Sequence, residues 1–255
     1  MSLARQHRDR TLAAKSAVHS AMEGGLAGPV ADLAPTAADT AHAQISMRLT
    51  HDLRRLKEIQ SIERKIEAKR EMLPHYRPWI EGLLAASEAT GEGVQDEVLP
   101  TIMIWLIDVG DFEAALLLAD YVLRHNVALP ARYARSAPAL IAEDIAAAAL
   151  KAQMANESFD VEILYRVEEL TADHDMHDEI RAKLQKAIGF ELADHAEAFA
   201  ENGPDRSKMV DLAEQALVHL RRAQQLHDRA GAKDKIKRLE KLLVPPKTET
   251  AGTTG

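Results

Sequence analysis

The spacing of hydrophobic residues predicts helices along almost the whole chain. Over residues 41–73, apolar side chains recur in two stripes at intervals of seven, which is typical of one long, coiled-coil-like amphipathic helix. Asp52, Glu63 and Arg70 interrupt the stripes, so packing against other helices or identical subunits is favoured over an isolated parallel dimer. We therefore expect this helix to mediate oligomerisation through Ile45, Leu49, Leu56, Ile59, Ile66 and Leu73.

Shorter helices follow, separated by prolines, glycines and capping residues. Pro74 and Pro78 end the long helix, because proline lacks an amide donor and restricts the residue before it. Tyr76 and Trp79, beside these prolines, are expected to anchor the corner in the core. Residues 74–243 are predicted to form an acidic body of antiparallel helical hairpins. Its helices are expected over residues 79–89, 94–109, 111–125, 137–156, 159–171, 176–201, 206–229 and 232–243.

One predicted hairpin, residues 105–115, resembles the turn of a tetratricopeptide helix pair. In that motif a glycine, here Gly110, permits close helix approach and small alanines let the second helix pack tightly. A true solenoid needs several such units at a spacing of about 34 residues, and the chain has no such series. The body is therefore expected to be only partly tetratricopeptide-like.

Both ends of the chain lack this regular pattern. Residues 1–40 are expected to form a flexible, basic N-terminal arm and linker, because glycines and prolines cluster between residues 24 and 35. The Ala-rich stretch over residues 12–22 favours a loose helix within the arm. Residues 244–255 are polar and without periodicity, and they are expected to form a disordered tail.

Composition supports an all-α fold and limits the chemistry. Ala and Leu dominate the apolar residues and aromatics make up only 4%, which favours helix over sheet. The chain has no cysteine, so a disulfide scaffold, a thiolate metal site and a cysteine nucleophile are excluded. No apolar run approaches the roughly 20 residues that span a bilayer, so we expect no membrane partner.

The net charge of −8 conceals an asymmetry along the chain. Residues 1–71 hold 12 Lys and Arg against 9 Asp and Glu, whereas residues 72–255 hold 20 against 31. Because an acidic surface repels nucleic acid, any DNA contact is expected in the basic front segment. The alternative is that these charges only solvate a helix face through pairs four residues apart. The predicted DNA-binding residues are Arg5, Arg8, Arg10, Lys15, Arg54, Arg55, Arg64, Lys65, Lys69 and Arg70.

A search for catalytic motifs is largely negative. The phosphate-binding loop G-x-x-x-x-G-K-[ST] is absent, and so are G-x-G-x-x-G, G-x-S-x-G and H-E-x-x-H. The segment 173–179 mixes carboxylates and histidines that suit a divalent metal, which makes Asp173, Asp175 and Asp178 weak catalytic candidates. Helix capping explains these acids better, since they precede or begin a predicted helix. We expect no metal site and no cofactor.

A second acidic series lies within the predicted helix over residues 176–201. Its carboxylates recur at helical intervals, as they do in two-metal carboxylate sites, but no second helix with a Glu-x-x-His motif is present. A solvated helix face is the expected explanation. The series is Glu191, Asp194, Glu197 and Glu201.

Three stretches together resemble a known family. They are the corner over residues 70–79, the run over residues 105–125 and the segment Leu129–Arg135 leading to residues 142–146. Their order and spacing are similar to the small terminase subunits of temperate, contractile-tailed phages with cohesive-end DNA, a family often labelled the terminase endonuclease subunit. The resemblance covers about residues 41–243.

The resemblance implies a role in packaging viral DNA. Such a protein would recognise the packaging site on double-stranded viral DNA, form a ring-like homo-oligomer and recruit a large terminase subunit that carries the ATPase and nuclease. It would act in the cytoplasm of the host bacterium. Two alternatives stay open at this point, a metal-dependent DNA endonuclease subunit of terminase and a helical protein-interaction scaffold without a DNA role.

Overall fold

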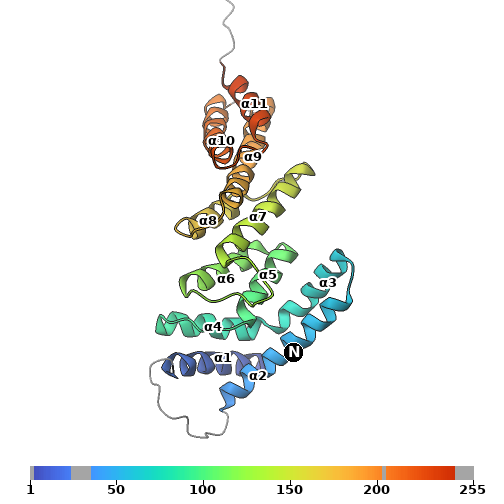
Figure 1. Ribbon diagram of the computed structural model, residues 1–255, viewed down its shortest axis with the longest axis vertical. Coiled ribbons are helices and arrows are strands. Elements are labelled where there is room, and N and C mark those ends of the chain that lie inside the picture. Colours follow the sequence, from blue (N-terminus) through green and yellow to red (C-terminus); the bar gives the residue numbers. More distant parts are fainter. Residues whose placement is uncertain (1–2, 24–35, 203–204, 245–255) are drawn as a thin grey trace, which may run out of the picture. The chain divides into compact units, whose positions relative to one another are not determined.

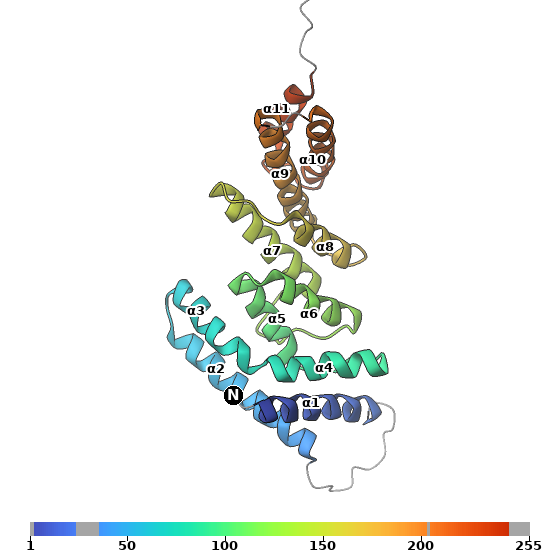
Figure 2. The ribbon, with the colours of Figure 1, turned by 180° about the vertical axis from the view of Figure 1, so that it is seen from behind.

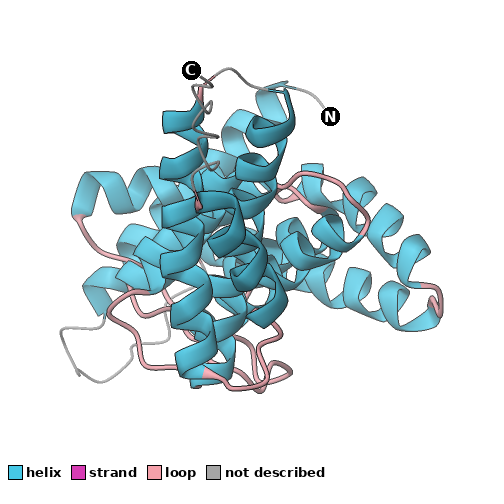
Figure 3. Ribbon diagram, turned by 90° about the horizontal axis from the view of Figure 1, so that it is seen from above, coloured by secondary structure: helices cyan, strands magenta, loops and turns pink. Residues whose placement is uncertain are grey.

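The protein is entirely helical in the part of the chain that the structure describes. The computed structural model contains eleven α-helices and one 3₁₀ turn there, and no strand, so the predicted all-α class is confirmed (Figures 1 and 3). No helix among these residues is long and apolar enough to cross a membrane. The chain divides into two compact units, residues 1–141 and residues 142–255. The described residues are 3–23, 36–202 and 205–244.

The N-terminal unit is built around two helix pairs. Helix α1 lies along α4, and α5 lies beside α6 (Figures 1 and 2). The corner between α3 and α4 places Tyr76 and Trp105 edge to face with ring centroids 5.8 Å apart, and both are buried. Trp79 is buried too, so the expected anchoring of this corner is confirmed. The helices are α1 (Leu3–Glu23), α2 (Ala37–Glu58), α3 (Ile62–Met72), η1 (Leu73–His75), α4 (Arg77–Thr90), α5 (Val98–Val109) and α6 (Phe112–Arg124).

The single helix predicted over residues 41–73 is in fact a helical hairpin. The backbone leaves the helical conformation at Ile59, with φ −88° and ψ 124°, and α3 starts only after Ser61. The Ser61 side chain accepts the N–H of Arg64 at 3.4 Å and so caps α3. No proline or glycine marks the break, and the spacing of apolar residues continues across it. The sequence pattern therefore predicts a single helix.

The arm expected over residues 1–40 differs in its helical part from what the sequence suggests. Residues 3–23 form the regular helix α1, and Ala13 is fully buried against α4. A Cβ at Gly82 of α4 would lie 2.5 Å from the Ala13 Cβ and from the Arg10 carbonyl oxygen, which shows how closely the two helices approach. Helix α1 is therefore a packed element of the unit. The linker expected at residues 24–35 lies outside the described residues.

The C-terminal unit centres on α9, which packs along α10 and also contacts α8 and α11 (Figure 2). A Cβ at Gly189 of α9 would lie 2.6 Å from the Leu220 side chain of α10, so the glycine permits this close approach. The boundary between the two units falls within α7. The helices are α7 (Ala137–Met154), α8 (Val161–Thr171), α9 (Asp178–Asn202), α10 (Arg206–Leu226) and α11 (Lys233–Leu243). The tail expected over residues 244–255 falls, after Val244, outside the described residues.

Local capping fixes several of the helix boundaries. Asp160 caps α8 by accepting the N–H of Glu162 at 2.9 Å, and Asp111 caps α6 by accepting that of Ala114 at 3.3 Å. Gly110 ends α5 with φ +83°, and the space around its α-carbon is open. Its role is thus to adopt the left-handed conformation. The close helix approach that the tetratricopeptide resemblance implied for this glycine is not present.

Candidate nucleic-acid interface

The connection between α2 and α3 carries a group of exposed cations. We call the end of this hairpin, residues 54–65, the hairpin tip (Figure 1). Arg54, Lys57 and Arg64 are exposed there and Lys65 is half-buried. Within the described part of the chain, none of these four has an ion pair. Arg54 and Lys57 stand near the end of α2, and Arg64 and Lys65 stand in the first turn of α3, so the four charges are close to one another along the hairpin. Lys57 is an addition to the predicted set.

Other predicted DNA-binding residues are engaged within the chain. Arg55 Nη2 donates to Glu71 Oε2 at 2.9 Å, and the two stand on opposite arms of the hairpin. Lys69 pairs with Asp108 at the end of α5 and is largely buried. Arg70 Nη2 donates to the carbonyl oxygen of Val109 at 3.1 Å. These three cations hold the hairpin together or fasten it to α5.

The predicted residues on α1 are distributed along that helix. Arg10 lies 3.8 Å from Glu81 of α4, and Arg8 lies 3.7 Å from its neighbour Asp9. Lys15 is exposed, and no ion pair involves it in the described part of the chain. The side chain of Arg5 lies outside the described residues. The structure therefore does not gather the α1 cations at one point, in contrast to those of the hairpin tip.

A groove of about 1020 Å³ separates α1, α2 and α4 and is lined by Arg8, Arg48 and His51 among others. At its base Tyr76 donates to Asp52 at 2.7 Å, and both side chains are buried. Burial and this hydrogen bond strongly raise the pKa of Tyr76, so the phenol stays protonated. The buried pair joins α2 to the corner before α4 and fixes the base of the hairpin.

The weak catalytic candidates do not converge. Asp173, Asp175 and Asp178 are all exposed, and Asp178 begins α9 as the capping interpretation expects. The nearby Arg181 donates to the carbonyl oxygen of His174 at 2.9 Å, so it closes the connection between α8 and α9. Among the described residues there is no group of three or more His, Asp or Glu side chains that could hold a metal ion.

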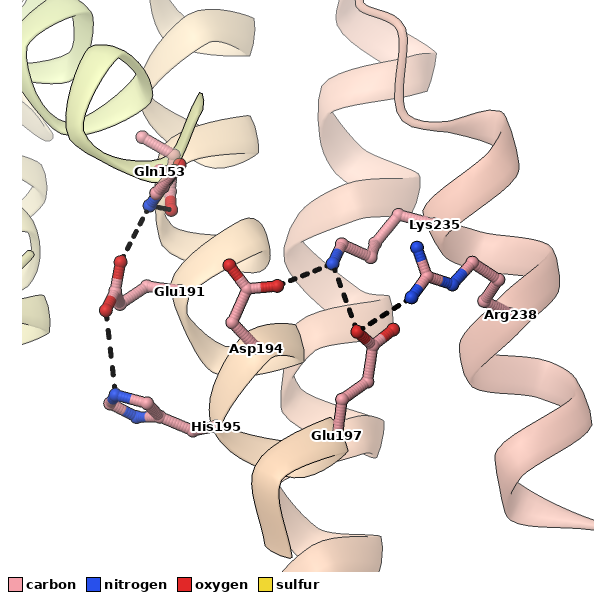
Figure 4. A network of polar contacts seen from close by, with 8 residues as sticks. Gln153, Glu191, Asp194, His195, Glu197, Lys235 and Arg238 are labelled. Atoms are coloured by element: carbon pink, nitrogen blue, oxygen red, sulfur yellow. Dashed lines mark hydrogen bonds and ion pairs between the residues drawn. The ribbon is translucent and has the colours of Figure 1, made fainter. Parts of the chain in front are cut away.

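Three carboxylates of α9 take part in a polar network, and the solvated face expected for the series is wrong for Glu191, which is buried (Figure 4). Glu191 is 1% exposed and accepts Gln153 Nε2 at 2.9 Å and the backbone N–H of Phe159 at 3.0 Å. His195 Nε2 lies 3.6 Å from the same carboxylate. Glu191 therefore ties α9 to the end of α7 and to the segment that leads into α8.

The next two carboxylates of α9 bind α11 (Figure 4). Lys235 Nζ lies 2.5 Å from Asp194 Oδ1 and 3.4 Å from Glu197 Oε2, and Arg238 donates to Glu197 at 3.0 Å. Each acid thus has a basic partner. Asp194 and Glu201 are both exposed, and among the described residues only Glu201 of the series has no ion pair. The spacing of the series serves helix packing in the C-terminal unit.

The residues predicted for oligomerisation occupy different environments. Leu49 and Leu56 are buried in the core of the N-terminal unit, so they stabilise the hairpin from inside. The outermost apolar side chain of the hairpin is Ile62, outside the predicted set, which is 75% exposed. The remaining four are half-buried and keep part of their apolar surface exposed, namely Ile45, Ile59, Ile66 and Leu73.

These features define an all-helical protein with a basic, solvent-exposed hairpin in one unit and ion-paired helix packing in the other. Comparison with known proteins is consistent with this class. The family described as phage small terminase subunit matches residues 46–179. The chain belongs to this family.

Two curated relatives match over most of their length. The "Terminase, endonuclease subunit" of Escherichia phage P2 is 40% identical over 214 residues, which are 84% of this chain and 79% of that protein. The "Probable terminase, endonuclease subunit" of Haemophilus phage HP1 (strain HP1c1) is 25% identical over 199 residues, 77% of this chain and 68% of that protein. No solved structure matches.

Proposed function

We propose that this chain is the DNA-recognising component of a phage packaging terminase. It binds double-stranded viral DNA at the packaging site, assembles with copies of itself and recruits a large subunit that carries the ATPase and nuclease. It acts in the cytoplasm of the host bacterium. The observation that carries the proposal is the group of four cations at the hairpin tip that have no ion pair with any described residue, in a member of the small terminase family.

The charge distribution supports DNA contact at this place. A phosphate oxygen can replace water around an exposed, unpaired guanidinium without breaking an existing ion pair. Arg54 and Arg64 meet this condition, whereas Arg55 and Lys69 would have to leave a carboxylate partner. The net negative charge of residues 72–255 disfavours DNA over most of that surface, which favours the tip as the main contact. Repetition of the tip in an oligomer would let several weak contacts hold one duplex.

The matched experiment compares two double variants of the same hairpin. Arg54→Ala with Arg64→Ala removes cations without an ion pair, and Arg55→Ala with Arg70→Ala removes engaged ones. In mobility-shift titrations with duplex DNA that carries the packaging site, we expect the first variant to bind at least about tenfold more weakly. The slope of log affinity against log salt should fall by about 1.8, because each lost phosphate contact removes about 0.9.

The control variant should lose less affinity, and circular dichroism should show the same helix content for both. If the two variants weaken binding equally, the contact involves the whole charged face of the hairpin. Unchanged binding of the first variant would reject the hairpin as the DNA contact. A protein that binds no DNA at any salt concentration would support the interaction-scaffold alternative.

Self-assembly is proposed to use the exposed parts of the apolar residues of the hairpin. Ile59→Asp with Ile66→Asp puts charges on two half-buried positions and should dissociate the oligomer in light scattering. Val218→Asp, at a 66% exposed position of α10, is the control and should leave the mass unchanged. Full assembly of the double variant, with its helix content retained, would locate the interface elsewhere.

A further inference from the structure

The C-terminal unit is acidic, yet it contains a groove whose lining includes three arginines. Residues 142–255 hold 16 Lys and Arg against 22 Asp and Glu. In this setting a groove of about 560 Å³ between the end of α8, α9 and α10 is lined by Arg181, Arg221 and Arg222. We call it the arginine groove. Glu168 is the only acid among its lining residues.

Two successive hydrogen bonds, through Gln185 and His219, orient the one carboxylate of the groove. The Gln185 amide nitrogen donates to Glu168, and the Gln185 amide oxygen lies 2.8 Å from His219 Nδ1. Burial lowers the pKa of His219, so the ring is neutral near pH 7 and Nδ1–H donates to the amide. Glu168 is thus oriented by a neighbour, and it does not form an ion pair with any of the three arginines.

The three arginines differ in how firmly they are held. Arg181 donates through Nη2 to the carbonyl oxygens of Thr171 and His174, which fixes its guanidinium at one end of the groove. Arg221 pairs with Glu240 of α11 at 2.8 Å on the surface. Arg222 is exposed, and among the described residues it has no ion pair. The groove therefore combines a fixed guanidinium with an available one and retains a net positive charge.

We propose that the arginine groove is a second phosphate-binding site, which takes the backbone of nucleic acid. Guanidinium groups match the geometry of phosphate oxygens, and the neutral side chain of Gln225 on the same lining offers a further donor. The exposed Val218 offers apolar contact to the sugar. The inference rests on the proposed DNA-binding function and adds a contact in the other unit of the chain.

Nucleic acid fits better than an acidic protein segment because a second contact on the same chain raises the effective concentration of DNA already held by the first. A weak arginine groove can then raise the affinity for DNA, and because it contacts only the DNA backbone it does not recognise the base sequence. The groove should consequently contribute to the salt dependence of binding and leave the preference for the packaging site unchanged.

The test replaces two arginines of the groove in the full-length protein. Arg221→Ala with Arg222→Ala is compared with Arg206→Ala and Arg229→Ala, which make the same charge change outside the groove. We expect the groove variant to bind duplex DNA about tenfold more weakly, with a salt slope smaller by about 0.9, because Arg222 is available to a phosphate whereas Arg221 is held by Glu240. Specific and random duplexes should be affected alike. Arg222→Gln, which retains polarity and removes one charge, should lower the slope by about 0.9.

Affinity and slope equal to those of the control would overturn the proposal, provided that circular dichroism and light scattering match the wild type. The single Arg222→Gln variant decides the matter if the double variant loses helix content. A competition experiment adds polyglutamate or polyphosphate to the DNA complexes of the wild type and of the groove variant. If polyglutamate displaces DNA from the wild type only, and polyphosphate does not, the groove binds an acidic protein and the proposal is overturned. The hairpin-tip variant is titrated in parallel, so failure of one site is seen separately from failure of the other.

Discussion

The hairpin tip and the acidic series of α9 have similar sequence patterns and opposite structural roles. Both place like charges at helical intervals, and both invite interpretation as a solvated face or as a binding site. At the tip, Arg54 and Arg64 project into solvent without ion pairs in the described part of the chain. In α9, Glu191 is buried and Asp194 and Glu197 are paired with α11. Charge spacing alone therefore cannot distinguish an interface from a packing network.

The physical difference lies in desolvation. A cation at the tip stays hydrated in the folded protein, so it carries little desolvation penalty. When it contacts a phosphate, it releases counterions from the DNA. A carboxylate as deeply buried as Glu191 is tolerated only when its oxygens accept hydrogen bonds, and here Gln153 and the N–H of Phe159 supply them. Substitutions at the two places should consequently change different properties, DNA affinity at the tip and stability in α9.

The largest expected effect in this comparison is the loss of stability on Glu191→Ala. The substitution removes the carboxylate that accepts the N–H of Phe159 and one of the two acceptors of Gln153 Nε2, which also donates to the carbonyl oxygen of Ala187, and it opens space beside α7. We expect a destabilisation of the C-terminal unit of about 3 kcal/mol, measured by urea unfolding. DNA affinity of the protein that remains folded should change little, in contrast to the hairpin-tip variants.

Glu201→Ala is the matched control, because Glu201 is an exposed glutamate of the same helix. It should change stability by less than about 0.5 kcal/mol. Glu191→Gln retains acceptor capacity and should fall between the two. Equal unfolding midpoints for all three variants would show that the network does not stabilise the C-terminal unit. The acids of α9 would then be as dispensable for stability as the cations of the hairpin tip.

The second prediction concerns α1, which packs against α4 and α2. Gly82→Leu introduces a side chain where even a Cβ would meet Ala13 and the backbone of Arg10 at 2.5 Å. Helix α1 must shift or detach, at a cost of about 2 kcal/mol. Limited proteolysis should then cleave within α1 faster than in the wild type.

Ala85→Leu on the exposed side of α4 controls for the larger side chain. It should leave the cleavage rate within α1 unchanged. If both variants and the wild type are cleaved equally fast, α1 is the tethered arm that the composition suggested, and Arg8 and Lys15 regain their place as mobile DNA contacts.

Much of the helical architecture could be predicted from the sequence because it depends on local signals. Asp111 and Asp160 cap helices where the sequence places them, and the apolar periodicity locates α4 to α11 to within a few residues. The break at Ile59 was missed because Ser61 is its only capping signal. The packing of α1 depends on the small residues Gly82 and Ala13, far apart in the sequence, which no local pattern connects.

The candidate site was predictable in type but not in detail. The basic front segment indicated the region, yet the division between engaged and available cations depends on partners such as Glu71 and Asp108. The pairing of the α9 acids is hidden in the sequence for the same reason, because Lys235 and Arg238 lie about forty residues away in the chain. Pairing over such distances is a tertiary property that charge spacing does not contain.

The smallest expected effect is a pH dependence of the N-terminal unit at His42. Its Nε2 lies 3.8 Å from Oδ1 of the buried Asp96, which also accepts the indole N–H of Trp79 and the N–H groups of Val98 and Leu99. The nearby carboxylate of Asp96 raises the pKa of His42, with Asp39 adding to the rise and partial burial opposing it. These contacts favour the protonated imidazole in the folded state.

Because the folded pKa is raised above the unfolded value, the contribution to stability is complete below the unfolded pKa and disappears as pH rises through the folded one. His42→Gln should therefore lower the unfolding midpoint at about pH 5.5 and have little effect at about pH 8.5. The effect should be small, since the imidazole is half-exposed and solvent screens the pair. His75→Gln, at an exposed position of the same unit, should show no such difference between the two pH values. A penalty for His42→Gln that is equal at both would mean that packing against the Trp79 ring, 5.7 Å away, and not the charge on the imidazole, is what the histidine contributes.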